Sequence, residues 1–195
     1  MRKVRKEKTM KKYLDLGSGR RALEGYDSTD FNINANTTYV FDLEKSPYPI
    51  KSNYYDKVYC RMVVEHLHNP SVVMREANRI LKEGGEFTVI TTHFSSCHAL
   101  IGDIHVSTFS YLYWYCWARY FEDMMVKINY PDWEYKTKNV KFARVNHKIV
   151  FGKSPFWNKK VEKLVNKSFS RQRIYESTFL CRLFPAEETI TVYRK

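Results

Sequence analysis

The sequence lacks most features of secreted, membrane-spanning or disulfide-stabilised proteins. It has four cysteines, seven glycines and six prolines in 195 residues. No uncharged run approaches the roughly 18 apolar residues that a membrane-spanning helix needs, and no apolar segment behind the basic start marks a signal peptide. Internal repeats and low-complexity tracts are also missing. We therefore expect a soluble, cytoplasmic protein with a single domain over residues 1–195.

The cysteines and histidines form no standard metal motif. Neither a CxxC pair nor an HExxH helix occurs, although several histidines fall between His66 and His105. We therefore predict no metal site, with metal binding as the alternative for this histidine-rich stretch. The cysteines lie among apolar residues and are expected to be buried, reduced thiols. They are Cys60, Cys97, Cys116 and Cys181.

Acidic side chains are scarce at two places along this chain of formal net charge +12. The segment 1–12 has seven basic residues against Glu7, and residues 136–173 have twelve against Glu162. Aromatic residues alternate with basic ones in the second segment, which is typical of nucleic-acid binding. The same pattern fits the solvated face of an amphipathic helix or, less favoured, a membrane-surface contact. The candidate contact residues are Lys159, Lys160, Lys163, Lys167 and Arg171.

Five apolar runs in the first half of the chain each end in a polar residue. The first three end in Asp15, Asp27 and Asp42, the fourth delivers Arg61, and the fifth leads into His93. In an open parallel sheet, ligands bind outside the carboxyl ends of the strands. The pattern therefore predicts several parallel strands whose polar ends share one binding site.

The clearest predicted helix lies between the fourth and fifth runs. Asn69 is placed to cap it, Pro70 suits the first turn, and apolar side chains from Val73 to Leu81 fall on one face before Gly84 and Gly85. Strand, helix and strand in this order form a right-handed crossover between parallel strands. The fold class is therefore α/β.

The glycine loop DLGSG, residues 15–19, follows the first predicted strand. Such a loop lets the backbone turn sharply and approach a ligand. Its simpler interpretation is a tight turn. The pattern from Gly17 to Ala22 also satisfies GxGxxA, but the acid of a dinucleotide-binding fold lies about 20 residues further on, which argues against a nicotinamide enzyme.

Taken together, three segments resemble the class I S-adenosylmethionine (SAM)-dependent methyltransferases, in particular the small type 11 branch. They are DLGSG, YYDKVYCRMVVEHLHNP and ANRILKEGGEFTVITTHFSS, and GDIHVSTFS follows just beyond them. The resemblance covers residues 11–110 and includes the closing strand ETITVYRK. It implies a Rossmann-like, mostly parallel sheet with an antiparallel last strand, SAM as methyl donor, and a basic, mostly helical insertion at 153–185 before the last strand.

The resemblance also implies roles for individual residues. The glycine loop would hold the methionine part of SAM, Asp27 the ribose hydroxyls, Asp42 with Leu43 the adenine, and Arg61 with Met62 the reacting sulfonium. Only seven residues separate Gly19 from Asp27, so the first crossover helix is expected to be shortened or missing. Asp30 is the substitute acid if the second strand ends later. The loop residues are Asp15, Leu16, Gly17, Ser18 and Gly19.

Three residues are candidate catalytic bases, namely His93, Asp103 and His105. His93 directly follows the fifth strand, and the other two lie in a loop that could fold over the site. Each has an alternative role in capping a strand or tying down the loop. The aromatic segment 110–125, with Tyr113, Trp114 and Trp117, is expected mainly to pack in the core, with an acceptor pocket or dimer surface as the alternative.

The chain is thus predicted to be a SAM-dependent methyltransferase, monomeric or homodimeric. Charge favours a nucleic acid as acceptor, and a small molecule or glycan is the close alternative. A second hypothesis is a catalytically inactive module that binds cofactor or nucleic acid on the same fold. The Lys, Asn, Ile and Tyr bias suggests an AT-rich coding genome of viral or microbial origin.

Overall fold

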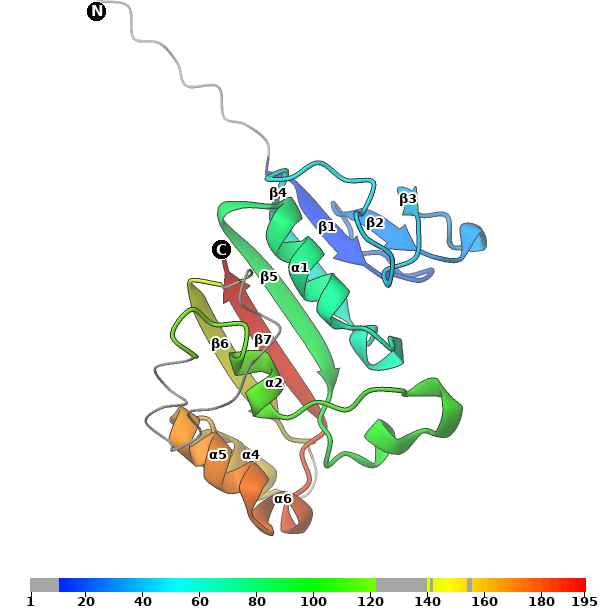
Figure 1. Cartoon of the computed structure of the whole chain (residues 1–195). Coiled ribbons are helices and arrows are strands. Elements are labelled where there is room, and N and C mark those ends of the chain that lie inside the picture. Colours follow the sequence, from blue (N-terminus) through cyan, green and yellow to red (C-terminus); the bar gives the residue numbers. More distant parts are fainter. Residues whose placement is uncertain (1–10, 122–139, 141, 154–155) are drawn as a thin grey trace, which may run out of the picture.

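The computed structural model describes residues 11–121, 140, 142–153 and 156–195 (Figure 1). Seven strands form one sheet in the order β3-β2-β1-β4-β5-β7-β6. The strands are β1 Tyr13–Leu16, β2 Asp27–Asp30, β3 Tyr39–Val40, β4 Tyr55–Arg61, β5 Leu81–Thr92, β6 Arg144–Val150 and β7 Glu188–Arg194. The first five are parallel, and β7 is antiparallel to both β5 and β6. The predicted α/β sheet with an antiparallel last strand is confirmed.

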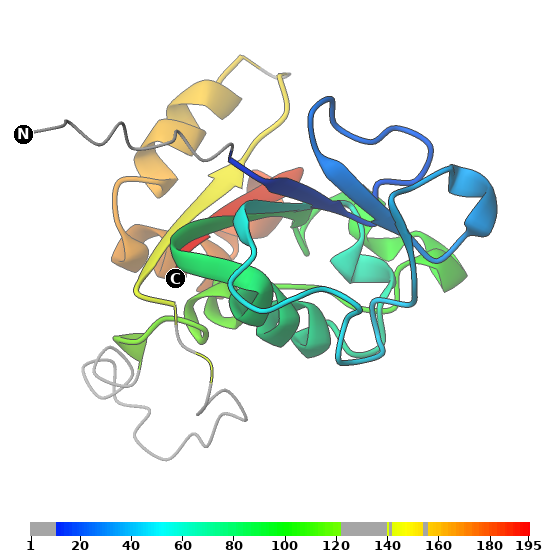
Figure 2. The same ribbon diagram turned by 90° about the horizontal axis from the view of Figure 1, so that it is seen from above.

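Two helices cover one face of this sheet, as the view from above shows (Figure 2). They are α1 Ser71–Ile80 and α2 Tyr111–Tyr115. Val73, Ala77 and Ile80 of α1 are completely buried against the strands, as their helical spacing predicted. The helix ends at Ile80, before Leu81 and before the two glycines that were expected to stop it, because Leu81 adopts an extended backbone and pairs with Tyr55 as the first residue of β5. Among the described residues, no helix is long and apolar enough to cross a membrane.

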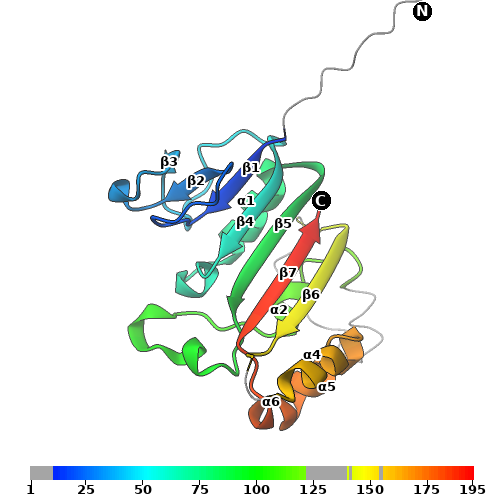
Figure 3. The same cartoon turned by 180° about the vertical axis from the view of Figure 1, so that it is seen from behind.

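The first crossover contains no helix, as its length predicted. Residues 17–26 run from β1 to β2 through turns. Figure 3 shows the consequence from behind, where no helix of the described ranges lies over β1, β4, β5 and β7. This face has charged and half-buried side chains, including Lys57, which forms an ion pair with Glu86 across neighbouring strands at 3.4 Å.

The second strand lies later than its apolar pattern predicted, and the placement of Asp27 at its carboxyl end is wrong. Gly25 has a φ of +77°, and the N–H of Tyr26 bonds back to the carbonyl of Leu23, so the run ALEGYD forms a turn. The ring of Tyr26 packs 5.1 Å from that of Tyr13. Asp27 is therefore the first residue of β2, at the amino end of the sheet.

Three short helices follow β6 and form what we call the helical cap, residues 156–183. They are α4 Asn158–Val165, α5 Phe169–Ser177 and α6 Leu180–Leu183. Side chains of the cap satisfy the outer backbone groups of β6, the edge strand of the sheet. Asn166 bonds both the N–H and the carbonyl of Ile149, at 2.8 and 2.7 Å, and Gln172 donates to the carbonyl of His147. The cap thereby blocks strand addition at this edge.

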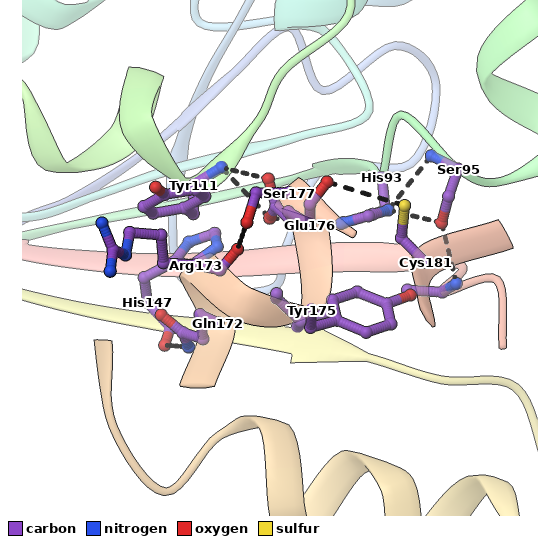
Figure 4. Close-up of polar contacts among 12 residues, drawn as sticks. His93, Ser95, Tyr111, His147, Gln172, Arg173, Tyr175, Glu176, Ser177 and Cys181 are labelled. Carbon is purple, nitrogen blue, oxygen red and sulfur yellow. Dashed lines mark hydrogen bonds and ion pairs between the residues drawn. The ribbon is translucent and has the colours of Figure 1, made fainter. Parts of the chain in front are cut away.

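A buried polar cluster joins the cap to β5 (Figure 4). Both oxygens of Glu176 accept the backbone N–H of Tyr111, at 3.1 and 3.0 Å. The Nδ1 atom of His93 accepts the backbone N–H of Ser95, so its Nε2–H can donate to Glu176 at 3.3 Å. Nearby, burial lowers the pKa of His147 to about 3, which keeps this ring neutral.

The aromatic segment after the fifth strand packs mainly in the core, as expected. Trp114 and Trp117 are completely or nearly completely buried. The ring of Tyr113 lies 5.0 Å from that of Trp114, edge to face. Tyr193 of β7 donates its hydroxyl proton to the carbonyl of Trp114 at 2.8 Å, which joins this segment to the sheet. The part of the segment beyond Phe121 lies outside the described residues.

Replacing Glu176 by Ala should lower the free energy of unfolding by about 3 kcal/mol, because a buried N–H and a buried imidazole lose their acceptor. Urea unfolding followed by circular dichroism measures this. The matched control is Glu83→Ala, at a mostly exposed position, which should change stability by less than about 0.5 kcal/mol. Equal effects of the two substitutions would mean that the cluster does not hold the cap.

Candidate functional site

A cavity of about 760 Å³ lies at the carboxyl ends of β1 to β4. Its walls come from the glycine loop (Gly17), the end of β2 (Asp30 and Phe31), the segment after β3 (residues 41–44) and the segment after β4 (Met62, Val63, His66 and Leu67). Its size suits a nucleotide-type ligand together with a small second molecule. The cavity thus lies where the ends of parallel strands predicted a shared site.

Gly17 brings the glycine loop against the segment after β4. It has a φ of +68°, and a Cβ at this position would lie 2.6 Å from Cγ2 of Val63. The next residue, Ser18, donates its N–H to the carbonyl of Thr29 at 2.9 Å, which ties the loop to β2. Glycine is therefore required both for the backbone conformation and for the close approach.

Asp30 is the acid that the structure brings to the cavity. Its Oδ2 accepts the N–H of Gly19 at 3.0 Å, and its Oδ1 accepts the N–H of Asn32 at 2.8 Å. A carboxylate offers about four acceptor positions, so two remain for a ligand. Asp27 lies at the other end of β2, where its Oδ2 accepts the hydroxyl of Tyr55 at 2.7 Å.

Arg61, the last residue of β4, and Met62, which follows it, lie on different surfaces of the molecule. Met62 lines the cavity and has a φ of +52°, a conformation that is rare outside glycine and that clusters at functional sites. The N–H of Met62 donates to the carbonyl of Ile90, which holds this turn. Arg61 is exposed on the uncovered sheet face and does not line the cavity.

Other residues predicted to contact the cofactor lie behind the lining. Asp15 is 5% exposed, and its Oδ2 accepts the N–H of Leu23 at 3.1 Å. Burial raises the pKa of this carboxyl above its usual value. Leu16 is completely buried, and Ser18 bonds to β2 rather than lining the cavity. Asp42 and Leu43 do line the cavity, as expected.

His66 was not among the predicted bases, yet it lines the cavity. Its Nδ1 lies 2.7 Å from the carbonyl oxygen of Ile104 and must carry the proton to bond there. The Nε2 atom is then left as an acceptor. The ring of His105 lies edge-on at 4.8 Å and completes the support. The signal in the sequence was the segment EHL, residues 65–67, whose histidine follows the fourth strand.

The neighbouring Glu65 is completely buried, and neither of its carboxylate oxygens has a hydrogen-bond partner in the described part of the chain. Its backbone carbonyl accepts the N–H groups of Val106 and Ser107, which anchors the loop 94–110 beside the site. An unpaired buried carboxylate costs stability. No feature of the sequence indicated this.

The three predicted bases lie in different surroundings. His93, expected to face the methyl group, is instead buried beneath the helical cap in contact with Glu176, away from the cavity lining (Figure 4). Asp103 lies in the short helix Gly102–Ile104, but its side chain is outside the described part. His105 does not line the cavity, and its ring contacts that of His66.

The cysteines behave largely as expected, with one exception. Cys60, Cys116 and Cys181 are buried free thiols, whereas Cys97 is exposed. In the described ranges, no group of three or more His, Cys, Asp or Glu side chains is arranged to hold a metal ion.

Comparison with known proteins identifies the domain. A family model described as a methyltransferase domain, Methyltransf_11, matches residues 14–89. This range contains the glycine loop, nearly all of β1, all of β2 to β4, α1 and most of β5. No curated protein sequence matched the chain.

Solved structures share the fold at low sequence identity. A SAM-dependent methyltransferase from Archaeoglobus fulgidus superimposes with a TM-score of 0.55 at 16% identity, over 96% of this chain and 87% of that one. A proposed methyltransferase solved in complex with the Trm112 activator of Haloferax volcanii gives 0.52 at 15% identity, over 94% and 82%. A proposed sarcosine dimethylglycine methyltransferase from Galdieria sulphuraria gives 0.51 at 15% identity, over 95% and 77%.

Gly17→Ala should collapse the cavity wall, because the new Cβ would overlap Val63 as well as strain the backbone. We expect a loss of about 2–4 kcal/mol in unfolding free energy and at least tenfold weaker SAM binding. Gly25→Ala is the matched control, since Gly25 also has a positive φ but no atom lies within 4 Å of its added Cβ. If both variants lost stability and SAM affinity equally, the contact with Val63 would have no special role.

Proposed function

This chain belongs to the class I SAM-dependent methyltransferases, and we propose that it methylates a small molecule bound beside His66. The observation that carries the proposal is the orientation of the His66 imidazole. Because Nδ1 is committed to the carbonyl of Ile104, Nε2 is the free basic atom of a cavity-lining side chain. A base in this position suits an acceptor that must lose a proton as it is methylated.

The cavity residues fit the donor. We assign the ribose hydroxyls to the unused acceptor positions of Asp30, and the adenine to the wall formed by Asp42 and Leu43. The backbone at Gly17 and Met62 would then border the methionine part and the sulfonium. When bound, SAM supplies an electrophilic methyl group. Its methylation chemistry needs mainly alignment of the acceptor and exclusion of water, which a walled cavity provides.

His66 would take the acceptor's proton at Nε2 as the acceptor atom bonds to the methyl carbon and the carbon–sulfur electron pair returns to sulfur. Ile104 holds the tautomer, and His105 supports the ring. His105 is thus a positioning residue in this proposal. His93 is a structural residue beneath the cap, because both of its ring nitrogens already have partners.

Three observations favour a small acceptor with an apolar part. Phe31 lines the cavity and is largely exposed, and Ile104, whose carbonyl contacts His66, is exposed as well. The predicted nucleic-acid contacts lie instead on α4, α5 and the turn between them, beyond β6, and four strand spacings separate β6 from β1. At about 4.8 Å per spacing this is roughly 19 Å, so a nucleic acid on the cap does not thereby enter the cavity. One structural neighbour is itself a proposed small-molecule methyltransferase.

Asp30→Ala should weaken SAM binding at least tenfold, because it removes two hydrogen-bond acceptors from the ribose. Asp27→Ala is the matched control on the same strand, and it should change SAM affinity less than about threefold. Isothermal titration with SAM and with S-adenosylhomocysteine measures both. A tenfold loss with Asp27→Ala and none with Asp30→Ala would reverse the assignment of the ribose acid.

Methyl transfer should be detected when the protein is given methyl-labelled SAM and a cell extract filtered to remove proteins and nucleic acids. Label transfer confined to purified RNA or DNA would contradict the small-molecule proposal. Absence of transfer to all fractions by a protein that binds SAM would favour the inactive-module hypothesis.

Once the labelled product has identified the acceptor, His66→Asn should lower kcat for that acceptor at least about 100-fold, while the KM for SAM should stay within about threefold. Asparagine keeps an N–H donor for the carbonyl of Ile104 but removes the base. His98→Asn, at an exposed position outside the cavity lining, is the control and should retain activity. Full activity of His66→Asn would exclude His66 as the base.

A further inference from the structure

We propose that the helical cap is a docking surface for an anionic lipid bilayer. The inference is independent of the proposed acceptor, since it rests on residues outside the cavity. The cap combines a one-sided positive charge with an unusual number of exposed, large apolar side chains. Each property is common alone, but the two together on one small helical unit are typical of proteins that bind membrane surfaces.

The positive charge of the cap is not balanced at its surface. Its two acids are both engaged, because Glu162 pairs with Lys148 of β6 at 2.7 Å and Glu176 is buried in the polar cluster. Neither reaches the basic face. The cap therefore presents a surface to which anionic headgroups are attracted. The exposed basic residues are Lys159, Lys160, Lys163, Lys167, Arg171 and Arg182.

Exposed apolar side chains of the cap lie next to its basic side chains on the surface, instead of being buried under them. Lys159 and Lys163 of α4 and Lys167 in the turn after it recur every four residues and are all exposed. Trp157 and Leu164 are exposed on the same segment. Lysine ammonium groups and apolar side chains are thus presented together, as an interfacial helix requires.

The apolar surface continues from α4 to α6. Trp157 and Leu183 line the same hollow, of about 240 Å³, between these helices. Phe156 packs its ring 5.0 Å from that of Trp157 and is 79% exposed, and Phe179 at the start of α6 is 71% exposed. Side chains this exposed contribute little to the folded core, so their apolar surface is available to a partner.

A bilayer explains this surface better than a nucleic acid does. Phosphate contacts alone would account for the lysines and arginines, and aromatic rings could stack on bases. Exposed Leu164, Ile174 and Leu183 cannot stack, but aliphatic side chains gain by entering the headgroup and acyl boundary. The cap should therefore lie on the membrane with both its aromatic and its aliphatic side chains inserted.

The test is flotation of the full chain with phosphatidylcholine vesicles, with and without about 30 mol% phosphatidylserine, at physiological salt. We expect at least about tenfold stronger binding to the anionic vesicles. The double variant Phe156→Ser with Phe179→Ser keeps every charge and should lose at least about fivefold of that binding. Reversal of Lys159, Lys163 and Lys167 to Glu should abolish it.

Matched controls are Val40→Ser and Lys45→Glu, at exposed positions outside the cap, which should leave vesicle binding unchanged. Circular dichroism verifies that each variant is folded. Absence of binding to anionic vesicles would overturn the proposal. Unchanged vesicle binding by the Phe156→Ser and Phe179→Ser double variant would also overturn it. If, in that case, single-stranded RNA displaced the wild-type protein from the vesicles, the cap would be a nucleic-acid-binding surface instead.

Discussion

The backbone of Gly17 lies so close to Val63 that no side chain fits between them, and the cavity depends on this contact. It joins the loop after β1 to the segment after β4, two places separated by more than forty residues of sequence. The same short loop bonds to β2 through Ser18 and to Asp30 through Gly19. One close approach thereby positions three walls of the site, which come from the glycine loop, the end of β2 and the segment after β4, and the last of these also carries His66.

The sheet reaches this arrangement with only one face covered by described helices. Parallel sheets are usually buried on both faces, because crossover helices alternate between them. Here the first crossover is a loop, so one face of the sheet lacks a helix within the described ranges. Buried and exposed side chains therefore alternate along β4. Val58 and Cys60 of β4 are buried against α1, whereas Lys57 and Arg61 of the same strand are exposed. The β4 strand therefore behaves like a strand of an antiparallel sheet with one solvated face.

The far end of the sheet is organised by polar groups rather than by a second large core. The cap contributes a small apolar cluster around Tyr175, but the β6 edge is closed by amide side chains and the end of β5 by Glu176. Because these groups are buried, they fix the cap in one orientation. That orientation leaves the lysine and apolar stripes of α4 outward, and it uses His93 as a structural residue instead of a catalytic one.

Local patterns by themselves determined the class of the fold, the glycine loop, the helix before β5 and the polar ends of most strands. These features depend on side-chain periodicity and on turns of a few residues, which a sequence displays directly. The same local rules misplaced β2, because the turn that packs Tyr26 against Tyr13 is stabilised by a contact with another strand. Asp30 replaced Asp27 at the cavity for that reason. Only the tertiary structure decided which histidine reaches the site, since the tautomer of His66 depends on Ile104, 38 residues away, and the burial of His93 on Glu176, 83 residues away.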